Sequence, residues 1–328
     1  MDIKHGSFVI SLDFEMMWGV KDICTPDEYG QTNVKNVREV IDRMLALFER
    51  YGAKATFATV GLLMFQDKRE ALKYLPKQQP QYVNPALSPF EDKYIENIED
   101  RYSRLYFAPD IVDKLRKSAN IEIASHTFSH YNCWAEGQTL AQFEQDVQAQ
   151  IDAMNLIGCG TPKSIVFPRN QVSPEYVELC KQFGIESYRG NPKRFYANSA
   201  NCIMRGVRRL LRLLDCYVEI DRTTTVDYSS ISNDSNITNI PASRFLRPYS
   251  KRLGVLEPLK LRRIKKEMLR AARNGELYHI WWHPHNFGSN VEENMANLEV
   301  ILAFYADCRK QYGMQSYTMS EFNKLITR

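Results

Sequence analysis

The sequence of 328 residues lacks several features that would assign it to a particular class of protein. It has no apolar run near the roughly 20 residues that a membrane-spanning helix needs. Its seven cysteines include no Cys-x-x-Cys pair, and their odd number is more typical of a reducing compartment than of a disulfide framework. The first apolar run, residues 8–12, is too short for the core of a signal peptide and is followed by Asp13. We therefore expect a cytoplasmic protein.

A signature of nucleic-acid binding is also absent, although positive charge is concentrated in one part of the chain. The net charge is +4, and residues 244–273 hold 11 lysines and arginines against Glu257 and Glu267. Four further arginines lie upstream, at Arg205, Arg208, Arg209 and Arg212. Two interpretations stay open: a solvated helical face, or a surface for an anionic partner such as a sugar nucleotide, a lipid diphosphate or an acidic membrane. Because no recognisable nucleic-acid-binding motif accompanies the charge, we expect no nucleic-acid partner.

The composition is that of a soluble globular protein, with 44% hydrophobic and 25% charged residues. Strand-like and helix-like patterns alternate along most of the chain. The predicted strands are 8–13, 54–60, 121–125, 164–168, 185–189, 278–283 and 315–319. The predicted helices are 36–50, 139–157, 173–183 and 292–311. Such alternation indicates an α/β fold in which crossover helices join parallel strands, and reactive residues gather at the C-terminal ends of such strands.

Two regions interrupt the alternation. Residues near 62–109 include a run rich in proline, glutamine and tyrosine, and residues near 190–260 include a polar run followed by the basic stretch. Long irregular insertions in a compact domain are typical of lids and substrate loops. No internal repeat or linker is visible, so we expect one domain over residues 1–328 with two inserted loop regions.

Two histidines, His126 and His130, follow the predicted strand at 121–125. If the chain turns helically there, side chains four residues apart point the same way, and two imidazoles can then share a divalent metal ion. Asp13 and Glu15 could supply a further ligand, because side chains two apart in an extended segment lie on one side. The alternative is that both histidines are ordinary polar residues at a strand end. Together these residues favour a metal site.

Two other predicted strands lead into residues suited to catalysis. Arg169 follows the fourth predicted strand, and the aromatic strand at 278–283 ends in His283. Alternation places His279 on the same face, but near the strand's start, where a structural role is expected. The role of His285 stays open.

The order of these motifs resembles that of a known family. D-x-E at 13–15, H-x-x-x-H at 126–130, F-P-R at 167–169 and an aromatic strand ending in His283 occur in the order found in polysaccharide deacetylases, the NodB-like enzymes of carbohydrate esterase family 4. The resemblance spans roughly residues 7–319, interrupted by the two insertions. It implies an irregular (β/α)7 barrel, and the seven strands predicted from the residues agree with that count.

The resemblance implies the ligands of a metal ion. His126 and His130 match the family's two metal-binding histidines. The family's usual second aspartate, also a ligand, is replaced here by Phe14. Because some relatives carry D-x-D or D-x-E, we expect Glu15 to be the third ligand. Two imidazoles and one carboxylate, with positions left open for water, suit Zn²⁺, with cobalt, nickel or iron as alternatives.

The resemblance also implies the groups that would move protons. Asp13 matches the general base, Arg169 the arginine that holds that base in place, and His283 the general acid. The family's aspartate that tunes the late histidine has no clear counterpart, and Asp221 and Asp227 are the candidates.

The function implied is a metal-dependent hydrolase that removes an N-acetyl or related acyl group from a sugar. The expected substrate is an acetylated sugar or sugar conjugate, such as a precursor of a surface polysaccharide (O-antigen or capsule). One alternative is an amidohydrolase that acts on small cyclic amides. Another is a non-catalytic carbohydrate- or membrane-binding module in which Phe14 marks a lost metal site. Trp18, Trp134 and Trp281 are candidates to stack on a sugar ring, with a place in the core as the alternative.

Overall fold

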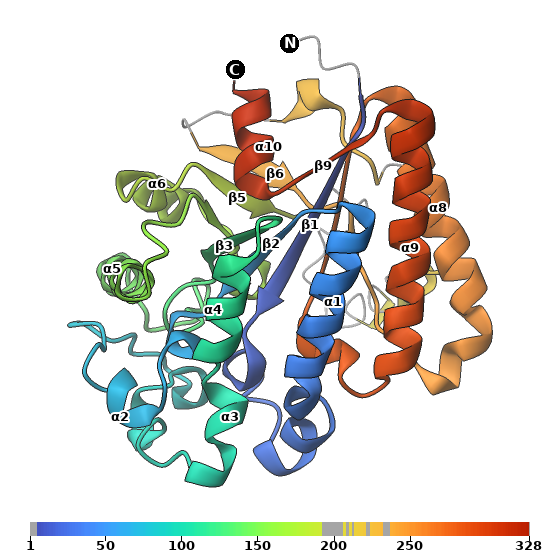
Figure 1. Cartoon of the computed structure of the whole chain (residues 1–328). Helices are drawn as coiled ribbons and strands as arrows, with labels where there is room; N and C mark the ends of the chain where they lie inside the picture. The colour runs from blue at the N-terminus through green and yellow to red at the C-terminus, as the bar shows by residue number, and fades with distance from the viewer. Residues whose placement is uncertain are drawn as a thin grey trace.

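The computed structural model describes residues 5–191, 206–207, 210–211, 213–220, 224–231 and 237–327. Within these ranges the chain forms an α/β fold around one sheet whose strand pairs are all parallel (Figure 1). The strands are β1 (Ser7–Phe14), β2 (Ala55–Thr59), β3 (Ile121–Ser125), β4 (Ser164–Ile165), β5 (Ser187–Gly190), β6 (Thr238–Pro241), β7 (Arg244–Phe245), β8 (Leu277–Trp282) and β9 (Gln315–Tyr317).

The sheet curls until its two edges are joined by the chain itself. Its order is β6-β5-β4-β3-β2-β1-β8-β7, with β9 beside the first residues of β1. Strands β6 and β7 are separated only by Ala242 and Ser243, yet β6 pairs with β5 and β7 with β8. The Ala242 N–H donates to Gly190 O (3.0 Å) and the Ser243 N–H to His279 O (2.7 Å). Residues 238–245 thus act as one bent strand that closes an irregular barrel.

Helices pack against the outer face of this barrel (Figure 1). They are α1 (Val37–Tyr51), α2 (Lys68–Ala71), α3 (Ser103–Tyr106), α4 (Pro109–Lys117), α5 (Leu140–Leu156), α6 (Pro174–Gln182), α8 (Glu257–Asn274), α9 (Val291–Tyr312) and α10 (Met319–Ile326). The four predicted helices are confirmed as α1, α5, α6 and α9. Helix α1 ends where expected, because Gly52 adopts a left-handed conformation (φ +61°) and its N–H donates to Glu49 O. No helix in the described ranges is long and apolar enough to cross a membrane.

The side chains of β1 alternate between two environments. Phe8, Ile10, Leu12 and Phe14 belong to the large apolar core that packs against the outer helices. Residues at the odd positions are buried on the other side, inside the barrel. Their character changes along the strand, from Val9 through Ser11 to Asp13. The interior is therefore apolar near its base, where residues of α10 join the core, and polar at the C-terminal end.

Two strand predictions differ from the structure. The strand predicted at 315–319 is β9, which lies off the main strand order. Its place in the barrel is taken by residues 238–245, inside the region near 190–260 that was interpreted as an insertion. These strands are short, and Pro241 interrupts the pattern, so neither shows a readable alternation. The rest of that region includes residues 192–205, 221–223 and 232–236, which lie outside the described residues, as do Arg205, Arg208, Arg209, Arg212 and Asp221.

Candidate metal centre

The C-terminal ends of β1, β3 and β8 meet at one end of the barrel, because parallel pairing aligns them. The arrowhead of β1 in Figure 1 points to this end, away from both termini. Glu15 follows β1, His126 and His130 follow β3, and His283 follows β8. Side chains from distant parts of the chain therefore lie together at the C-terminal end of the barrel, as the alternating pattern predicted.

Three buried side chains form a cluster suited to a metal ion, here called the Glu15 cluster: Glu15, His126 and His130. Their ligand atoms all lie within 4.8 Å of one another. Glu15 Oε2 is 3.1 Å from His126 Nε2 and 3.0 Å from His130 Nε2. The three side chains are nearly inaccessible to solvent. This is the donor set of two imidazoles and one carboxylate expected from the sequence.

The hydrogen bonds around His126 show that a cation fits this cluster. His126 Nδ1 lies 2.7 Å from Val166 O, which can only accept, so Nδ1 carries the hydrogen of the neutral ring. In the neutral ring, the lone pair of Nε2 then faces the Glu15 carboxylate, 3.1 Å away. Burial alone would raise the pKa of Glu15, but the imidazoles of His283 and His130 hold it well below its usual value. An anionic oxygen facing an imidazole lone pair is repulsive unless a cation lies between them.

The two histidines converge through a strained turn rather than through the helical turn predicted from their spacing. Thr127 and His130 have φ values of +61° and +58°, in the left-handed region that non-glycine residues rarely adopt. The buried Asp146 of α5 stabilises the turn, because its carboxylate accepts hydrogen bonds from the N–H groups of Phe128 (2.7 Å) and Ser129 (3.2 Å). Burial raises the pKa of Asp146 to about 7.

The arginine that pairs with Asp13 is Arg189, at the end of β5, and not Arg169 as the resemblance implied. Arg189 Nη1 and Nη2 donate to the two carboxylate oxygens of Asp13 at 2.6 and 2.8 Å. Burial alone would raise the pKa of Asp13, but Arg189 outweighs it and the pKa lies below its usual value. Arg189 also donates to Ser11 Oγ (3.1 Å), and Ser11 lies 2.8 Å from His279 Nε2. His279 therefore belongs to a buried network beneath Asp13, the structural role expected for it.

The Arg169 side chain points away from Asp13 and pairs with Asp22, because the chain turns sharply after β4. Its φ is +56° and that of Asn170 is +54°. Arg169 Nη2 pairs with Asp22 Oδ2 at 2.7 Å, and its side chain remains 36% exposed. The turn nevertheless supports the Asp13–Arg189 pair, because Asn170 Oδ1 accepts a hydrogen bond from Arg189 (2.9 Å). The sequence placed this turn at the site but assigned the wrong arginine to Asp13.

His283 faces both carboxylates of the site. Its Nε2 atom is 3.7 Å from Asp13 Oδ2 and 3.5 Å from Glu15 Oε1. His285, whose role the sequence left open, stacks on His283 with ring centroids 5.1 Å apart, and burial lowers its pKa to about 3. Asp227 lies near the opposite end of β8, since its neighbour Val226 bridges Leu277, so it does not tune His283.

The three tryptophans have different environments. Trp18 is buried in the core and donates a hydrogen bond to Tyr106 O, so it is not free to stack on a sugar. Trp281 is covered by the guanidinium of Arg189, 4.2 Å from the ring centroid. Trp134 is 59% exposed, and its indole N–H donates to Ser173 Oγ (2.8 Å). Trp134 is the most exposed of the three, and Trp281 is half-buried.

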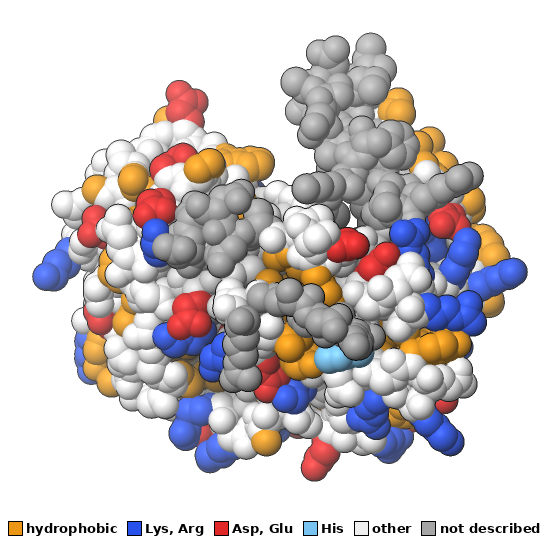
Figure 2. Space-filling view, turned by 90° about the horizontal axis from the view of Figure 1, so that it is seen from above, with side chains coloured by type: hydrophobic (Ala, Val, Ile, Leu, Met, Phe, Trp, Pro, Cys, Tyr) orange, Lys and Arg blue, Asp and Glu red, His pale blue; other side chains and the backbone are white. Residues whose placement is uncertain are grey.

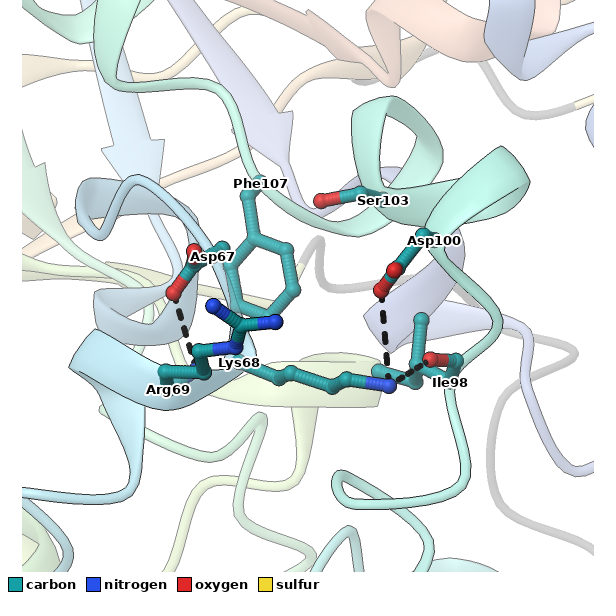
Figure 3. A pocket seen from close by; sticks show the side chains of 7 residues that line it. All are labelled: Asp67, Lys68, Arg69, Ile98, Asp100, Ser103 and Phe107. Carbon is teal, nitrogen blue, oxygen red and sulfur yellow. Dashed lines mark hydrogen bonds and ion pairs between the residues drawn. The ribbon is translucent and has the colours of Figure 1, made fainter.

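A pocket of about 190 Å³ lies elsewhere, in the region near 62–109 (Figure 3). Its Lys68 and Asp67 side chains are already hydrogen-bonded within the protein. Lys68 Nζ donates to Ile98 O (2.5 Å), and Asp67 accepts from the backbone N–H of Arg69 (2.9 Å). None of the Glu15 cluster lines this pocket, so it is not part of the proposed site.

The basic stretch at 244–273 is only partly a surface. Arg244, Lys260 and Arg263 are buried in ion pairs with acidic residues. Exposed basic side chains of the stretch include Lys251, Arg252, Arg262, Lys266, Arg270 and Arg273. Figure 2, which views the end of the molecule near the termini, shows Lys and Arg side chains gathered on its right, the side of α8 and α9.

Comparison with known proteins finds a family whose sequence profile matches part of the chain. Residues 27–188 match the sequence profile of polysaccharide deacetylases, a segment that includes both metal-site histidines. The matched segment is therefore similar in sequence to the polysaccharide deacetylase family. The match starts after Glu15 and ends before Arg189 and His283, so the structure is what connects those residues to the matched segment. None of the curated proteins compared with the chain matched it.

Solved structures share the fold at low sequence identity. A crystal structure described as a polysaccharide deacetylase of Mycobacterium smegmatis has a TM-score of 0.60 and 12% identity, covering 99% of this chain and 91% of that one. Another, from Pseudomonas aeruginosa, has a TM-score of 0.54 and 10% identity, covering 97% and 89%. The Puue allantoinase has a TM-score of 0.52 and 11% identity, covering 97% and 89%. These likenesses establish the shared fold.

Proposed function

We propose that this protein is a metal-dependent hydrolase that removes an N-acetyl or related acyl group from a sugar. The observation that carries the proposal is the Glu15 cluster, with Asp13 and His283 beside it at the C-terminal end of the barrel. A divalent cation held by the Glu15 cluster, with Zn²⁺ the best match to its donors, would supply Lewis-acid polarisation of the acyl carbonyl.

The residues of the chain then divide the proton transfers between them. Asp13, kept anionic and fixed by Arg189, takes a proton from the attacking water. His283 in its protonated form supplies the Nε2 proton to the departing nitrogen, which leaves as an amine while His283 becomes neutral. Asp13 Oδ2 lies 3.7 Å from His283 Nε2, so the proton taken by the aspartate can be returned to the histidine. General acid–base catalysis of this kind contributes about 10²–10⁴-fold to the rate.

The substrate that we propose is a nucleotide- or lipid-linked precursor of a surface polysaccharide. Support comes from the exposed basic residues of 244–273, which would attract a diphosphate or an anionic membrane surface. Arg244, Lys260 and Arg263 are excluded from this contact because they are buried. Neutralising Arg252, Arg262 and Lys266 together should raise the KM for a diphosphate-linked substrate at low salt and leave it unchanged for a neutral sugar. The cytoplasmic location stays a prediction.

Metal content and activity test the proposal together. Wild-type protein should contain about one equivalent of metal by mass spectrometry, and His126→Ala and Glu15→Ala should both lose it. Acetate release should be measured on a panel of N-acetylated nucleotide sugars, and ring opening should be measured on small cyclic amides. Asp227→Asn is the matched control, because Asp227 is exposed and lies near the opposite end of β8. Activity on cyclic amides alone would replace the sugar substrate, and wild type that binds no metal would overturn the hydrolase.

A further inference from the structure

Apolar side chains face solvent where α8 begins. Val255 lies in the short 3₁₀ turn Lys251–Leu256 that leads into the helix, and its side chain is 88% exposed. Pro258 and Leu259, in the first turn of α8, are exposed as well. Single exposed apolar residues are common on soluble proteins, but apolar side chains that gather on one surface mark a site of interaction. The start of α8 is therefore a candidate contact surface.

A second segment extends this surface. Leu214 and Val218 are exposed, and both lie in a segment that is held against α8. Arg263 donates a hydrogen bond to Val218 O and pairs with Asp215 at 2.9 Å. Because Arg263 lies one helical turn after Leu259, on the same side of α8, Val218 lies beside the exposed start of the helix. We call this surface the apolar patch, and its residues are Leu214, Val218, Val255, Pro258 and Leu259.

Basic side chains border the apolar patch. Lys251 and Arg252 precede it in sequence and Arg262 follows it, and all three are exposed. No acidic residue in the described part of the chain pairs with them. The single acidic residue between Lys251 and Arg262 is Glu257, which is buried and pairs with Lys260 at 2.6 Å. The start of α8 is thus apolar and positively charged, and it exposes no carboxylate of its own.

The start of α8 lies at the end of the barrel that holds the Glu15 cluster. Asn297 donates a hydrogen bond to Glu257 (2.6 Å), and the Tyr249 N–H donates to Asn294 Oδ1 (2.7 Å). Both asparagines lie in the first part of α9, which follows the C-terminal end of β8. Helix α8 then runs back along the barrel to the start of β8 (Figure 1). A flat surface that contacts the apolar patch would therefore lie near the metal centre.

We propose that the apolar patch, together with Lys251, Arg252 and Arg262, docks onto an anionic lipid bilayer. An interfacial segment needs this combination, because apolar side chains enter the headgroup region while lysines and arginines contact anionic headgroups. A second copy of the chain would bring the same basic border against this one, and like charges would repel. The bilayer is therefore the occupant that the charges favour.

The consequence for the substrate rests on the proposed hydrolase function. Docking at this end of the barrel would bring the Glu15 cluster close to the headgroups of the bilayer. A lipid-linked sugar is held at that level by its own lipid, whereas a nucleotide sugar is free in solution. Of the two precursors named above, the apolar patch therefore favours the lipid-linked one.

Sedimentation with lipid vesicles tests the docking surface. Wild type should bind vesicles that contain phosphatidylglycerol, should not bind pure phosphatidylcholine, and should bind more weakly as NaCl is added. Val255→Ser combined with Leu259→Ser keeps every charge and should lower the affinity by at least about tenfold. Arg252→Ser combined with Arg262→Ser should lower it by about thirtyfold. Wild type that binds no vesicles, or unchanged affinity in the Val255 and Leu259 variant, would overturn the proposal.

Two matched controls separate this surface from the properties of the whole protein. Lys310→Ser combined with Lys324→Ser removes the same charge from exposed positions in α9 and α10, near the opposite end of the barrel. Leu156→Ser removes an exposed apolar side chain at the end of α5. Both variants should bind vesicles as wild type does. Losses as large as those of the patch variants would assign binding to net charge or general stickiness, and the proposal would fail.

The remaining occupant is checked without lipid. In sedimentation equilibrium wild type should be a monomer, and a dimer that Val255→Ser with Leu259→Ser dissociates would assign the surface to a second copy and overturn the proposal. Vesicle binding needs neither a metal ion nor a substrate, so Glu15→Gln should bind vesicles as wild type does. Vesicle binding without turnover of any acylated sugar would contradict the hydrolase alone. Turnover of a soluble acylated sugar without vesicle binding would contradict the docking surface alone.

Discussion

Two of the groups of buried charged side chains in the described residues have their charges balanced in different ways. The Glu15 cluster occupies the C-terminal end of the interior. The second group, here called the Arg244 cluster, lies between the barrel wall and α8 and consists of Arg244, Glu267, Arg263 and Asp215. All of these side chains are largely excluded from water, so each group must compensate charges that are costly to bury.

In the Arg244 cluster the chain supplies every countercharge. Arg244 Nε donates to Glu267 Oε2 (2.7 Å), and Arg263 Nε donates to Glu267 Oε1 (3.0 Å). Arg263 Nη2 pairs with Asp215 Oδ1 at 2.9 Å, and the Tyr278 hydroxyl donates to Glu267. Two guanidinium groups thus balance two carboxylates, and no further ion is needed.

In the Glu15 cluster the chain supplies atoms that can bind a metal ion, namely one carboxylate oxygen and two imidazole nitrogens. Among the described residues no lysine or arginine pairs with Glu15, and its partners are imidazoles, one of which turns a lone pair toward it. The comparison shows that burial of charge alone does not identify a functional site. What distinguishes the Glu15 cluster is that its geometry calls for a cation that the chain does not provide.

The largest expected effect is the removal of the Glu15 carboxylate. Glu15→Gln should abolish metal binding and lower deacetylation by about 10³–10⁴-fold, because Lewis-acid stabilisation is worth several kcal/mol. A chelator should lower the Tm of wild type, since a bound ion stabilises only the folded state, and should leave the Tm of Glu15→Gln unchanged. Equal responses to the chelator would contradict the role of Glu15.

The corresponding change in the Arg244 cluster should affect folding and not chemistry. Glu267→Ala leaves Arg244 and Arg263 short of a countercharge, so the free energy of unfolding should fall by about 3–5 kcal/mol. Glu219→Ala is the control, because Glu219 pairs with the exposed Lys266 and such surface pairs contribute only about 0–1 kcal/mol. Urea denaturation measures both, and kcat of the folded Glu267→Ala protein should equal that of wild type.

A smaller effect on kcat is expected from a change in Arg189, the arginine that pairs with Asp13. Arg189→Lys cannot make the bidentate contact with Asp13, and loss of charge-assisted hydrogen bonds worth about 1.5–3 kcal/mol should lower kcat by about ten- to a hundredfold. Arg169→Lys should change kcat much less, because Arg169 pairs with Asp22. The opposite ranking would return Arg169 to the role that the family resemblance implied.

The smallest effect is confined to acid conditions. Burial alone would raise the pKa of Glu267, but Arg244 outweighs it and the pKa lies below its usual value. A carboxyl group of this kind contributes stability above its unfolded pKa, about 4.3, and loses it as the pH falls. Below that pH, wild type should lose stability more steeply than Glu267→Gln, by at most about 1.4 kcal/mol per pH unit. Equal slopes in acid urea titrations would contradict the pairing.

Sequence reasoning located the Glu15 cluster because its residues belong to short motifs at predicted strand ends. It missed Arg189, although the same rule applied: Arg189 ends the strand predicted at 185–189, the kind of position that drew attention to His126. It also missed Asn286, which the sequence shows only as a polar residue after His283 and whose side chain lies 3.2 Å from His283 Nδ1. Both omissions concern partners whose identity depends on which side chains meet across the barrel.

The sequence by itself determined the alternation of strands and helices, the faces of β1, and the motifs that carry Glu15, His126, His130 and His283. These are local properties, set by side-chain periodicity and by residues adjacent in the chain. Only the tertiary structure decided which arginine pairs with Asp13, which of the basic residues at 244–273 are buried, and how residues 238–245 close the barrel. Those outcomes depend on contacts between residues far apart in sequence, where packing and charge compensation select among partners of the same chemical type.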